Sequence, residues 1–249
     1  MTEEKNGHTS IQEEGQNEVS VQYVAYCDIL GFSNRILTDF DNTLKTYREF
    51  GKLVCGGGPF KEVKTTMYSD AIVITATSLV RVLQAAQGLW FFALANNFML
   101  RGAITQGRYW EQRSGNNLLV ASDALVRAVQ LEKSVGVPAI VIADDVEIPD
   151  AYWLARFQAG PYVTALLHFR DRNIVNPFNL MWGVSAATRA SILMGENPQH
   201  KDKYLWFIAL HEAVASGQEL LIPPPVIKRF MEQGILKFGA SAEQNQPPT

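Results

Sequence analysis

The sequence is poor in cysteine and in histidine, which argues against two common kinds of structural site. Its 249 residues include two cysteines, Cys27 and Cys55, so no disulfide framework is expected and a reducing compartment fits. The four histidines, at positions 8, 168, 200 and 211, lie in no ligand-like spacing, so a zinc site is not expected. With 47% hydrophobic residues, the chain can instead form one sizeable core.

An excess of positive charge is also missing. The formal net charge is −3, from 22 Lys and Arg against 25 Asp and Glu. Proteins that coat nucleic acids carry a basic field to offset the phosphates. We therefore expect no nucleic-acid partner, whereas small anionic ligands remain possible.

The sequence has no apolar run of membrane-spanning length. Its most apolar stretch, residues 88–100, contains Asn96 and Asn97 and is shorter than the ~20 residues of a membrane span. Residues 1–19 are polar, with no apolar core of the kind a signal peptide needs, and residues 241–249 are polar again. We expect two disordered tails, no membrane segment and a cytoplasmic location.

The segment between the tails alternates strand and helix patterns. Strands are predicted for residues 21–28, 62–69, 71–76, 99–107 and 138–143, and helices for 33–54, 78–98 and 122–133. This order predicts an α+β fold, with a ferredoxin-like or palm-type, mostly antiparallel sheet and helices on one face. We expect residues 20–148 to form this core. Residues 149–240 would be an extension packed on the core, with helical patterns near 182–194 and 204–215.

Two aspartates stand where predicted strands end. Asp28 closes the first strand before a Gly-Phe-Ser turn, and Asp70 follows Ser69 at the tight turn of a hairpin. If the strands are neighbours, both carboxylates meet at one edge of the sheet. Hard oxygen ligands at such an edge suit Mg²⁺ or Mn²⁺ holding a triphosphate.

Strand periodicity places further polar side chains on the face that carries the aspartates. Alternate residues of a strand face opposite sides, so Tyr26 shares a side with Asp28, and Thr66 and Tyr68 share a side with Asp70. Arg101 lies on the corresponding side of a later strand. We expect this polar face to meet a ligand, a partner or both.

Simpler readings of the same residues remain open. Asp28 can cap the helix that follows its turn, and Asp70 can be an ordinary turn aspartate. Arg101 can serve a dimer or surface ion pair instead of contacting phosphate or base. Tyr26 and Tyr68 can be packing residues with wet hydroxyls.

The stretch after the first strand resembles the Asp-Ile-x-Gly-Phe-Ser/Thr motif of class III nucleotidyl cyclases. The matching residues are Asp28, Ile29, Gly31, Phe32 and Ser33. The family's second aspartate corresponds to Asp70, its Arg-x-Gly-x-x-x-Gly strand resembles residues 101–107, and its Ala-x-x-Leu-Glu helix end resembles residues 128–132. The resemblance covers about residues 20–147.

This resemblance implies a set of roles. Asp28, Asp70 and the Ile29 carbonyl would bind two Mn²⁺ or Mg²⁺ ions. The amides of residues 30–33, which are Leu30, Gly31, Phe32 and Ser33, would hold the β- and γ-phosphates. The 3′-hydroxyl would attack the α-phosphorus in line. Family members share the site between two chains, so we expect a homodimer in which Arg101 completes the partner's site, with Arg108 a weaker candidate.

The departures from the family point to the substrate. Val126 and Gln130 stand where purine cyclases have a catalytic asparagine and arginine, and Thr66 replaces the adenine-reading lysine. The other base-reading position falls near Leu119. Metal ligands that are kept beside a rebuilt base pocket resemble the Pycsar antiphage cyclases, which make cyclic pyrimidine mononucleotides.

That group implies a pyrimidine substrate and a signalling role. Thr66 and Tyr68 would contact the base, the substrate would be UTP or CTP, and UTP is chosen on overall resemblance only. The product would be a cyclic mononucleotide that activates a separate effector protein during phage infection. Two alternatives stay open, which are a cytidylate cyclase and a catalytically silent module that binds nucleotide or a partner.

Overall fold

The computed structural model describes residues 18–160, 164–178, 183–216 and 221–236. Nearly all of the expected tail 1–19 and all of the expected tail 241–249 lie outside the described residues. Within the described part of the chain, no helix combines the length and the apolarity needed to cross a membrane.

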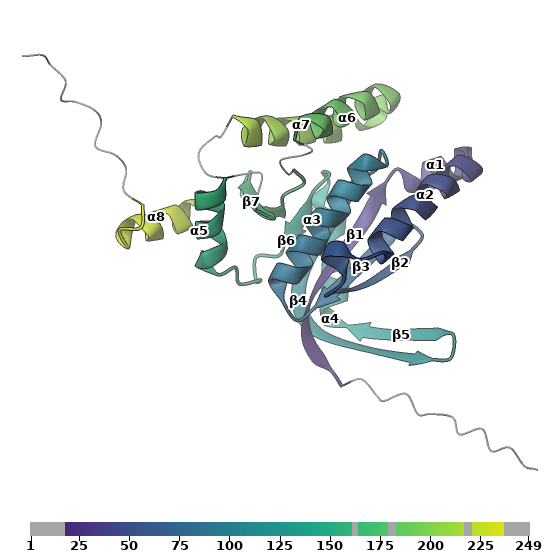
Figure 1. The fold of residues 1–249 in the computed structure, drawn as a ribbon, viewed down its shortest axis with the longest axis horizontal. Helices are drawn as coiled ribbons and strands as arrows, with labels where there is room; N and C mark the ends of the chain where they lie inside the picture. Colours follow the sequence, from purple (N-terminus) through teal and green to yellow (C-terminus); the bar gives the residue numbers. More distant parts are fainter. Residues whose placement is uncertain (1–17, 161–163, 179–182, 217–220, 237–249) are drawn as a thin grey trace, which may run out of the picture.

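The centre of the molecule is an eight-stranded sheet with the strand order β2-β3-β1-β4-β6-β8-β7, in which β5 pairs with β4 outside this row (Figure 1). Every pairing is antiparallel except that of β4 with β6. The strands are β1 (Ser20–Leu30), β2 (Lys64–Tyr68), β3 (Ala71–Ala76), β4 (Met99–Ser114), β5 (Asn117–Ser122), β6 (Ile140–Ile142), β7 (Leu166–Phe169) and β8 (Arg172–Val175).

The first part of the sheet has ferredoxin-like connectivity. The chain runs through β1, two helices, β2, β3, one helix and β4, and the strands lie in the spatial order β2-β3-β1-β4. The α+β class and the mostly antiparallel sheet are therefore confirmed. The helices are α1 (Phe32–Thr38), α2 (Phe40–Cys55), α3 (Leu79–Ala95), α4 (Asp123–Val135), α5 (Asp150–Ala159), α6 (Gly183–Glu196), α7 (Lys201–Ala215) and α8 (Pro224–Glu232), with short 3₁₀ turns at Gly58–Phe60 and Pro198–His200.

The single helix expected over residues 33–54 is wrong, because the chain breaks at Asp39. That residue has an extended φ of −145°, and its carboxylate accepts a hydrogen bond of 3.2 Å from the amide of Asn42. An aspartate in this position satisfies an amide that the helix itself leaves unpaired. The cap therefore ends α1 after seven residues and begins α2.

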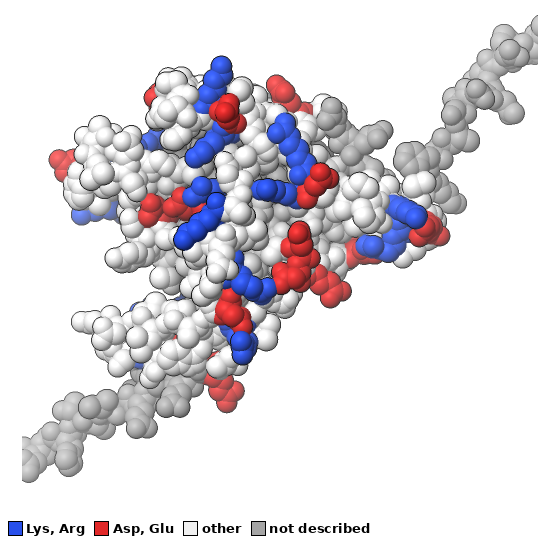
Figure 2. Space-filling view, turned by 180° about the vertical axis from the view of Figure 1, so that it is seen from behind, with Lys and Arg blue, Asp and Glu red and all other residues white. Residues whose placement is uncertain are grey.

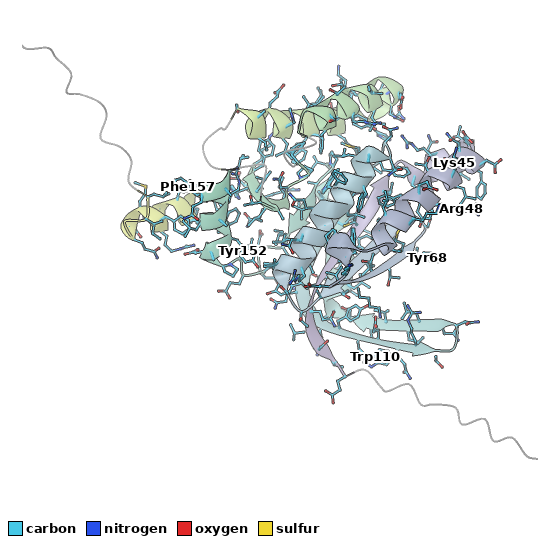
Figure 3. The ribbon with its side chains drawn as sticks, in the orientation of Figure 1. Lys45, Arg48, Tyr68, Trp110, Tyr152 and Phe157 are labelled. Atoms are coloured by element: carbon cyan, nitrogen blue, oxygen red, sulfur yellow. The ribbon has the colours of Figure 1, made fainter. Side chains whose placement is uncertain are left out.

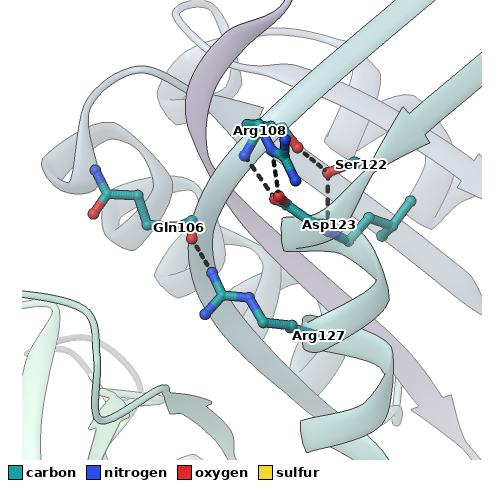
Figure 4. Close-up of polar contacts among 6 residues, drawn as sticks. Gln106, Arg108, Ser122, Asp123 and Arg127 are labelled. Atoms are coloured by element: carbon teal, nitrogen blue, oxygen red, sulfur yellow. Dashed lines mark hydrogen bonds and ion pairs between the residues drawn. The ribbon is translucent and has the colours of Figure 1, made fainter.

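The strand expected to end at Gly107 continues to Ser114 and returns as β5, which was not predicted. Gly107 stays inside the strand because its missing side chain leaves room for α4, where a Cβ atom would collide with the Asp123 carboxylate. That carboxylate accepts hydrogen bonds of 2.7 Å from both the amide and the Nε of Arg108 (Figure 4). The Ser122 hydroxyl donates to the carbonyl of Arg108 and accepts from the amide of Leu125, so it caps the start of α4.

The helices divide between the two faces of the sheet. Ala25, Cys27 and Ile104 are fully buried in the main core with α2 and α3. On the opposite face, α4 covers β1 and β4, and the Thr105 hydroxyl donates to the carbonyl of Ala124 at 2.7 Å. The prediction of helices on one face thus holds for α2 and α3. Helix α4 departs from it, because it lies on the face that carries the aspartates.

The sheet continues past residue 148, where we expected the core to end. β8 pairs with β6, and β7 pairs with β8. The helical patterns near 182–194 and 204–215 are confirmed as α6 and α7, and Phe207 of α7 packs on Trp90 of α3 with ring centroids 5.5 Å apart. The division at 148 stays a prediction, although the extension shares the main core.

Candidate active site

Asp28 and Asp70 lie beside each other at the edge of the sheet where β1 ends and β3 begins. Asp28 pairs in register with Ala71, the residue after Asp70. The amide of Ile29 donates a hydrogen bond of 3.0 Å to the Asp70 carbonyl, which ties the hairpin turn to the end of β1. The condition set by the sequence, that the two strands be neighbours, is met.

The turn after β1 brings the start of α1 against Asp70. Gly31 has a left-handed φ of 77°, which glycine adopts without steric cost. The Ser33 hydroxyl then donates to the Asp70 carboxylate at 3.3 Å. Since Gly31 stands at the N-cap position and no side chain caps α1, Asp28 is not a helix cap. The phosphate contacts of residues 30–33 stay a prediction.

Arg101 faces Asp28 directly from the neighbouring strand. The two residues are cross-strand partners in β4 and β1, and the Nη2 atom lies 3.5 Å from the Asp28 carboxylate. The Nε atom of Arg101 contacts the carboxylate of Glu132 on α4. Arg101 is therefore held within its own chain, and its role in a partner's site stays a prediction.

Glu132 is the residue of this site that sequence reasoning missed. Only 3% of it is exposed, although glutamate is almost never buried without a partner. A signal was present, because Ala124, Ala128 and Glu132 recur every four residues and so share the buried side of α4. The acidic member of that row predicts a buried cation opposite, which Arg101 supplies.

The electrostatics of the site favour a cation. The pKa of Asp28 is raised to about 6, mainly by burial and in smaller measure by the nearby carboxylates of Asp70 and Glu132. The positive charges of Arg101 and Lys203 oppose this shift without cancelling it. The pKa of Tyr26 is raised by burial and by the same carboxylates. The carboxylates therefore outweigh the cations at this edge of the sheet.

This donor set fits a hard divalent cation. Two neighbouring carboxylates offer oxygen ligands, and a positive ion at this edge would offset both the burial of the Asp28 charge and its smaller repulsion from Asp70. Within the described residues there is no group of three or more His, Cys, Asp or Glu side chains placed to hold a metal ion. A metal here would therefore take its remaining oxygens from backbone, water or substrate, and the Ile29 carbonyl stays a predicted ligand.

Thr66 and Tyr68 lie on β2, at the edge of the sheet. Tyr68 shares a cross-strand row with Ala71 and Asp28, and Thr66 shares the next row with Val73 and Tyr26. Two strand spacings separate β2 from β1, which is roughly 10 Å. Tyr68 is 82% exposed, and Figure 3 labels it by the end of β2. Both residues are thus on the aspartate face and within a nucleotide's length of Asp28.

Comparison with known proteins gives similarity in shape alone. No family model matches the chain, and no curated protein matches it. Among solved structures, the guanylyl cyclase Cya2 is 10% identical with a TM-score of 0.42, over 65% of this chain and 93% of that one. A class III adenylyl cyclase-like ATP-binding protein from Pseudomonas aeruginosa is 10% identical with a TM-score of 0.44, over 68% of this chain and 40% of that one.

A bacterial light-regulated adenylyl cyclase is 9% identical with a TM-score of 0.40, over 50% of this chain and 44% of that one. This chain thus spans less than half the length of two of these three proteins. Likeness at this level assigns neither a family nor an activity. The functional argument therefore rests on the residues of the site.

The positions that separate this chain from purine cyclases are apolar or unpaired surface residues here. Val126 on α4 is 55% exposed and Leu119 on β5 is 50% exposed. Gln130 is also exposed on α4. Seen from behind, charged side chains gather over the middle of the molecule, while the β4–β5 hairpin is mostly uncharged (Figure 2).

Proposed function

We propose that the chain is a nucleotidyl cyclase that converts a pyrimidine nucleoside triphosphate, with UTP preferred, to a 3′,5′-cyclic mononucleotide and diphosphate. The observation that carries this proposal is the meeting at one sheet edge of Asp70 and Asp28, which begins the Asp-Ile-x-Gly-Phe-Ser motif. A scaffold has no need for two carboxylates at one sheet edge, where burial and then the charge of Asp70 raise the pKa of Asp28.

Each residue of the site has a definite task in this reaction. Asp28 and Asp70 would hold two Mn²⁺ or Mg²⁺ ions, which when bound make the 3′-hydroxyl more acidic and offset charge on the leaving diphosphate. Ser33 orients the Asp70 carboxylate through its hydroxyl. Glu132 fixes the Arg101 guanidinium beside Asp28, where its charge can stabilise the transition state.

The base would be contacted from β2. The Thr66 hydroxyl can donate or accept a hydrogen bond at the edge of uracil or cytosine, and the exposed ring of Tyr68 can lie against a single-ring base. A purine would lack the long donor that the resembled family places at position 66. UTP over CTP rests on overall resemblance, because a hydroxyl serves either base.

A homodimer would complete the site. The exposed apolar residues Val120 of β5 and Val126 of α4 lie on the side of the sheet that carries the aspartates and would be covered by a second copy. Arg101, the residue expected to act in the partner's site, would have to leave Asp28 and Glu132 of its own chain to do so. The cyclic product would act in antiphage defence by activating a separate effector protein.

A second candidate function is a catalytically silent nucleotide-binding module. One observation favours it, which is that the Arg101 guanidinium lies 3.5 Å from the Asp28 carboxylate and so competes with a metal for that side chain. The exposed Val126 and Gln130, where purine cyclases carry catalytic side chains, point the same way. Turnover decides between the two functions.

The test is to incubate the full chain with all four ribonucleoside triphosphates and Mn²⁺ and to identify the product by mass. Cyclic UMP is expected, and cyclic CMP would keep the enzyme while correcting the base. Cyclic AMP or GMP as main product would overturn the base assignment. Nucleotide binding without any product would leave the silent module, with Asp28→Asn as the matched control for contaminating activity.

A further inference from the structure

A second hollow lies on the other side of the turn after β1. This cavity, of about 330 Å³, is formed between the turn, the start of β4 and the α6–α7 pair of the C-terminal extension. Leu30 and Gly31 line it from the turn, and Arg35 lines it from α1. Lys203 and Tyr204 line it from α7. Nothing in the proposed reaction has so far used this space.

The lining of the cavity is selective for negative charge. It includes the cations Arg35 and Lys203, together with His200 and several amide side chains, and it includes no carboxylate. Within the described part of the chain, neither Arg35 nor Lys203 forms an ion pair with an acidic residue. Glu196 acts on Tyr204, but it lines the neighbouring hollow. The Arg35 guanidinium lies over the Phe98 ring, 5.3 Å from its centroid, which leaves its charge unneutralised, so two cations around one cavity can bind an anion.

The cavity borders the turn that also carries the carboxylate site. Leu30 and Gly31 line the cavity and also belong to the stretch in which the phosphate contacts are predicted. The ammonium of Lys203 is close enough to oppose protonation of Asp28. A ligand that begins at the carboxylates and carries negative charge away from them therefore meets Lys203 next.

We propose that this cavity is the site of the polyphosphate end of the nucleotide, with Arg35 and Lys203 as its cations. The inference rests on the proposed function and adds to it a task for the extension, because α7 supplies a substrate-binding side chain to its own chain's site. A diphosphate with several waters fits 330 Å³, since each liquid water takes about 30 Å³. The same contacts would hold the diphosphate after the reaction, so product release would be limited by them.

The test measures binding of inorganic diphosphate to the full chain by calorimetry, in EDTA so that no metal contributes. Wild type is expected to bind, and Lys203→Gln and Arg35→Gln are each expected to bind at least about tenfold more weakly, which corresponds to one lost charged contact. Lys201→Gln is the matched control, because Lys201 begins the same helix, is exposed and does not line the cavity. UTP should displace the diphosphate and UMP should not.

Equal affinity in Lys203→Gln and Lys201→Gln, no binding by wild type, or a failure of UTP to compete would overturn the inference. These results are separable from those on catalysis. If diphosphate binds through Lys203 but no cyclic product forms, the proposed cyclase activity is ruled out and the anion site is supported. If Lys203→Gln forms cyclic product with an unchanged KM for UTP, the cyclase activity is supported and the anion site is ruled out. Thermal unfolding of each variant checks that it is folded.

Discussion

The two sides of the turn after β1 carry opposite charge. On one side lie Asp28 and Asp70 with Glu132 behind them, and on the other lies the cavity with Arg35 and Lys203. The acidic side is built by neighbouring strands, whereas the cationic side needs α7, which follows about 170 residues later in the chain. A single turn can thus present a metal-binding side and an anion-binding side to one elongated ligand.

The largest expected effect comes from removing the acidic side. Asp28→Asn and Asp70→Asn should each lower product formation by at least ~10²- to 10³-fold, the range typical of deleting one electrostatic stabiliser. Mass detection of the cyclic product measures this. Near-normal turnover with Mn²⁺ in either variant would show that the carboxylates do not hold the metals.

Metal binding should distinguish the two sides. Mn²⁺ at 100 times its dissociation constant should stabilise wild type by ~2.7 kcal/mol, because it binds the folded chain alone. Asp28→Asn should lose most of this gain, and Lys203→Gln should keep it, since Lys203 is no metal ligand. Thermal unfolding with and without Mn²⁺ gives the comparison. Loss of the gain in both variants would contradict separate roles for the two sides.

The turn itself should be sensitive to a single methyl group. Gly31→Ala places a side chain at a φ of 77°, and a left-handed conformation costs a non-glycine residue about 1–2 kcal/mol. We expect this loss of stability together with weaker binding on both sides. Gly51→Ala, in the middle of α2 with open space around its Cβ, is the control and should stabilise by about 0.5–1 kcal/mol. Equal behaviour of the two variants in denaturant unfolding would argue against strain at the turn.

The smallest effect concerns stability and pH without metal. Because the pKa of Asp28 is raised from 3.8 to about 6, the folded chain holds a proton that the unfolded chain releases between these values. The contribution of Asp28 is fully present below about pH 4 and is lost as the pH rises through 6. Asp28→Asn should therefore be as stable as wild type at pH 4 and more stable at pH 7.5.

The size of that gain is limited by the contacts of Asp28. A shift of about two units, in which the Arg101 charge is already counted, corresponds to at most ~3 kcal/mol, and the partial exposure of the Asp28 side chain reduces the expected gain to on the order of 1 kcal/mol. Urea unfolding at both pH values in EDTA measures it. A variant that is less stable than wild type at pH 7.5 would show that the ion pair outweighs the burial of the carboxylate.

The acidic side could be predicted from the sequence and the cationic side could not. Asp28 lies two residues before the end of β1 and Asp70 lies in the β2–β3 turn, each with a clear local signal, and the pairing of β1 with β3 brings them together. The break at Asp39 was missed because a helical pattern continues through it, although aspartate is a favoured cap. Lys203 gave no signal, because its place depends on how α7 packs against α3 through Phe207 and Trp90.

Cys27, one residue before Asp28, gives the site a reporter of its own. Its thiol is fully buried on the opposite face of β1, and burial raises its pKa, so alkylating reagents can reach it only when that strand opens. Cys55 at the end of α2 is exposed and would be modified first. The labelling rate of Cys27 would then report how often the strand end that carries Asp28 opens, with the labelling of Cys55 as an internal reference. Any ligand that bridges Asp28 and Asp70 should slow the labelling of Cys27.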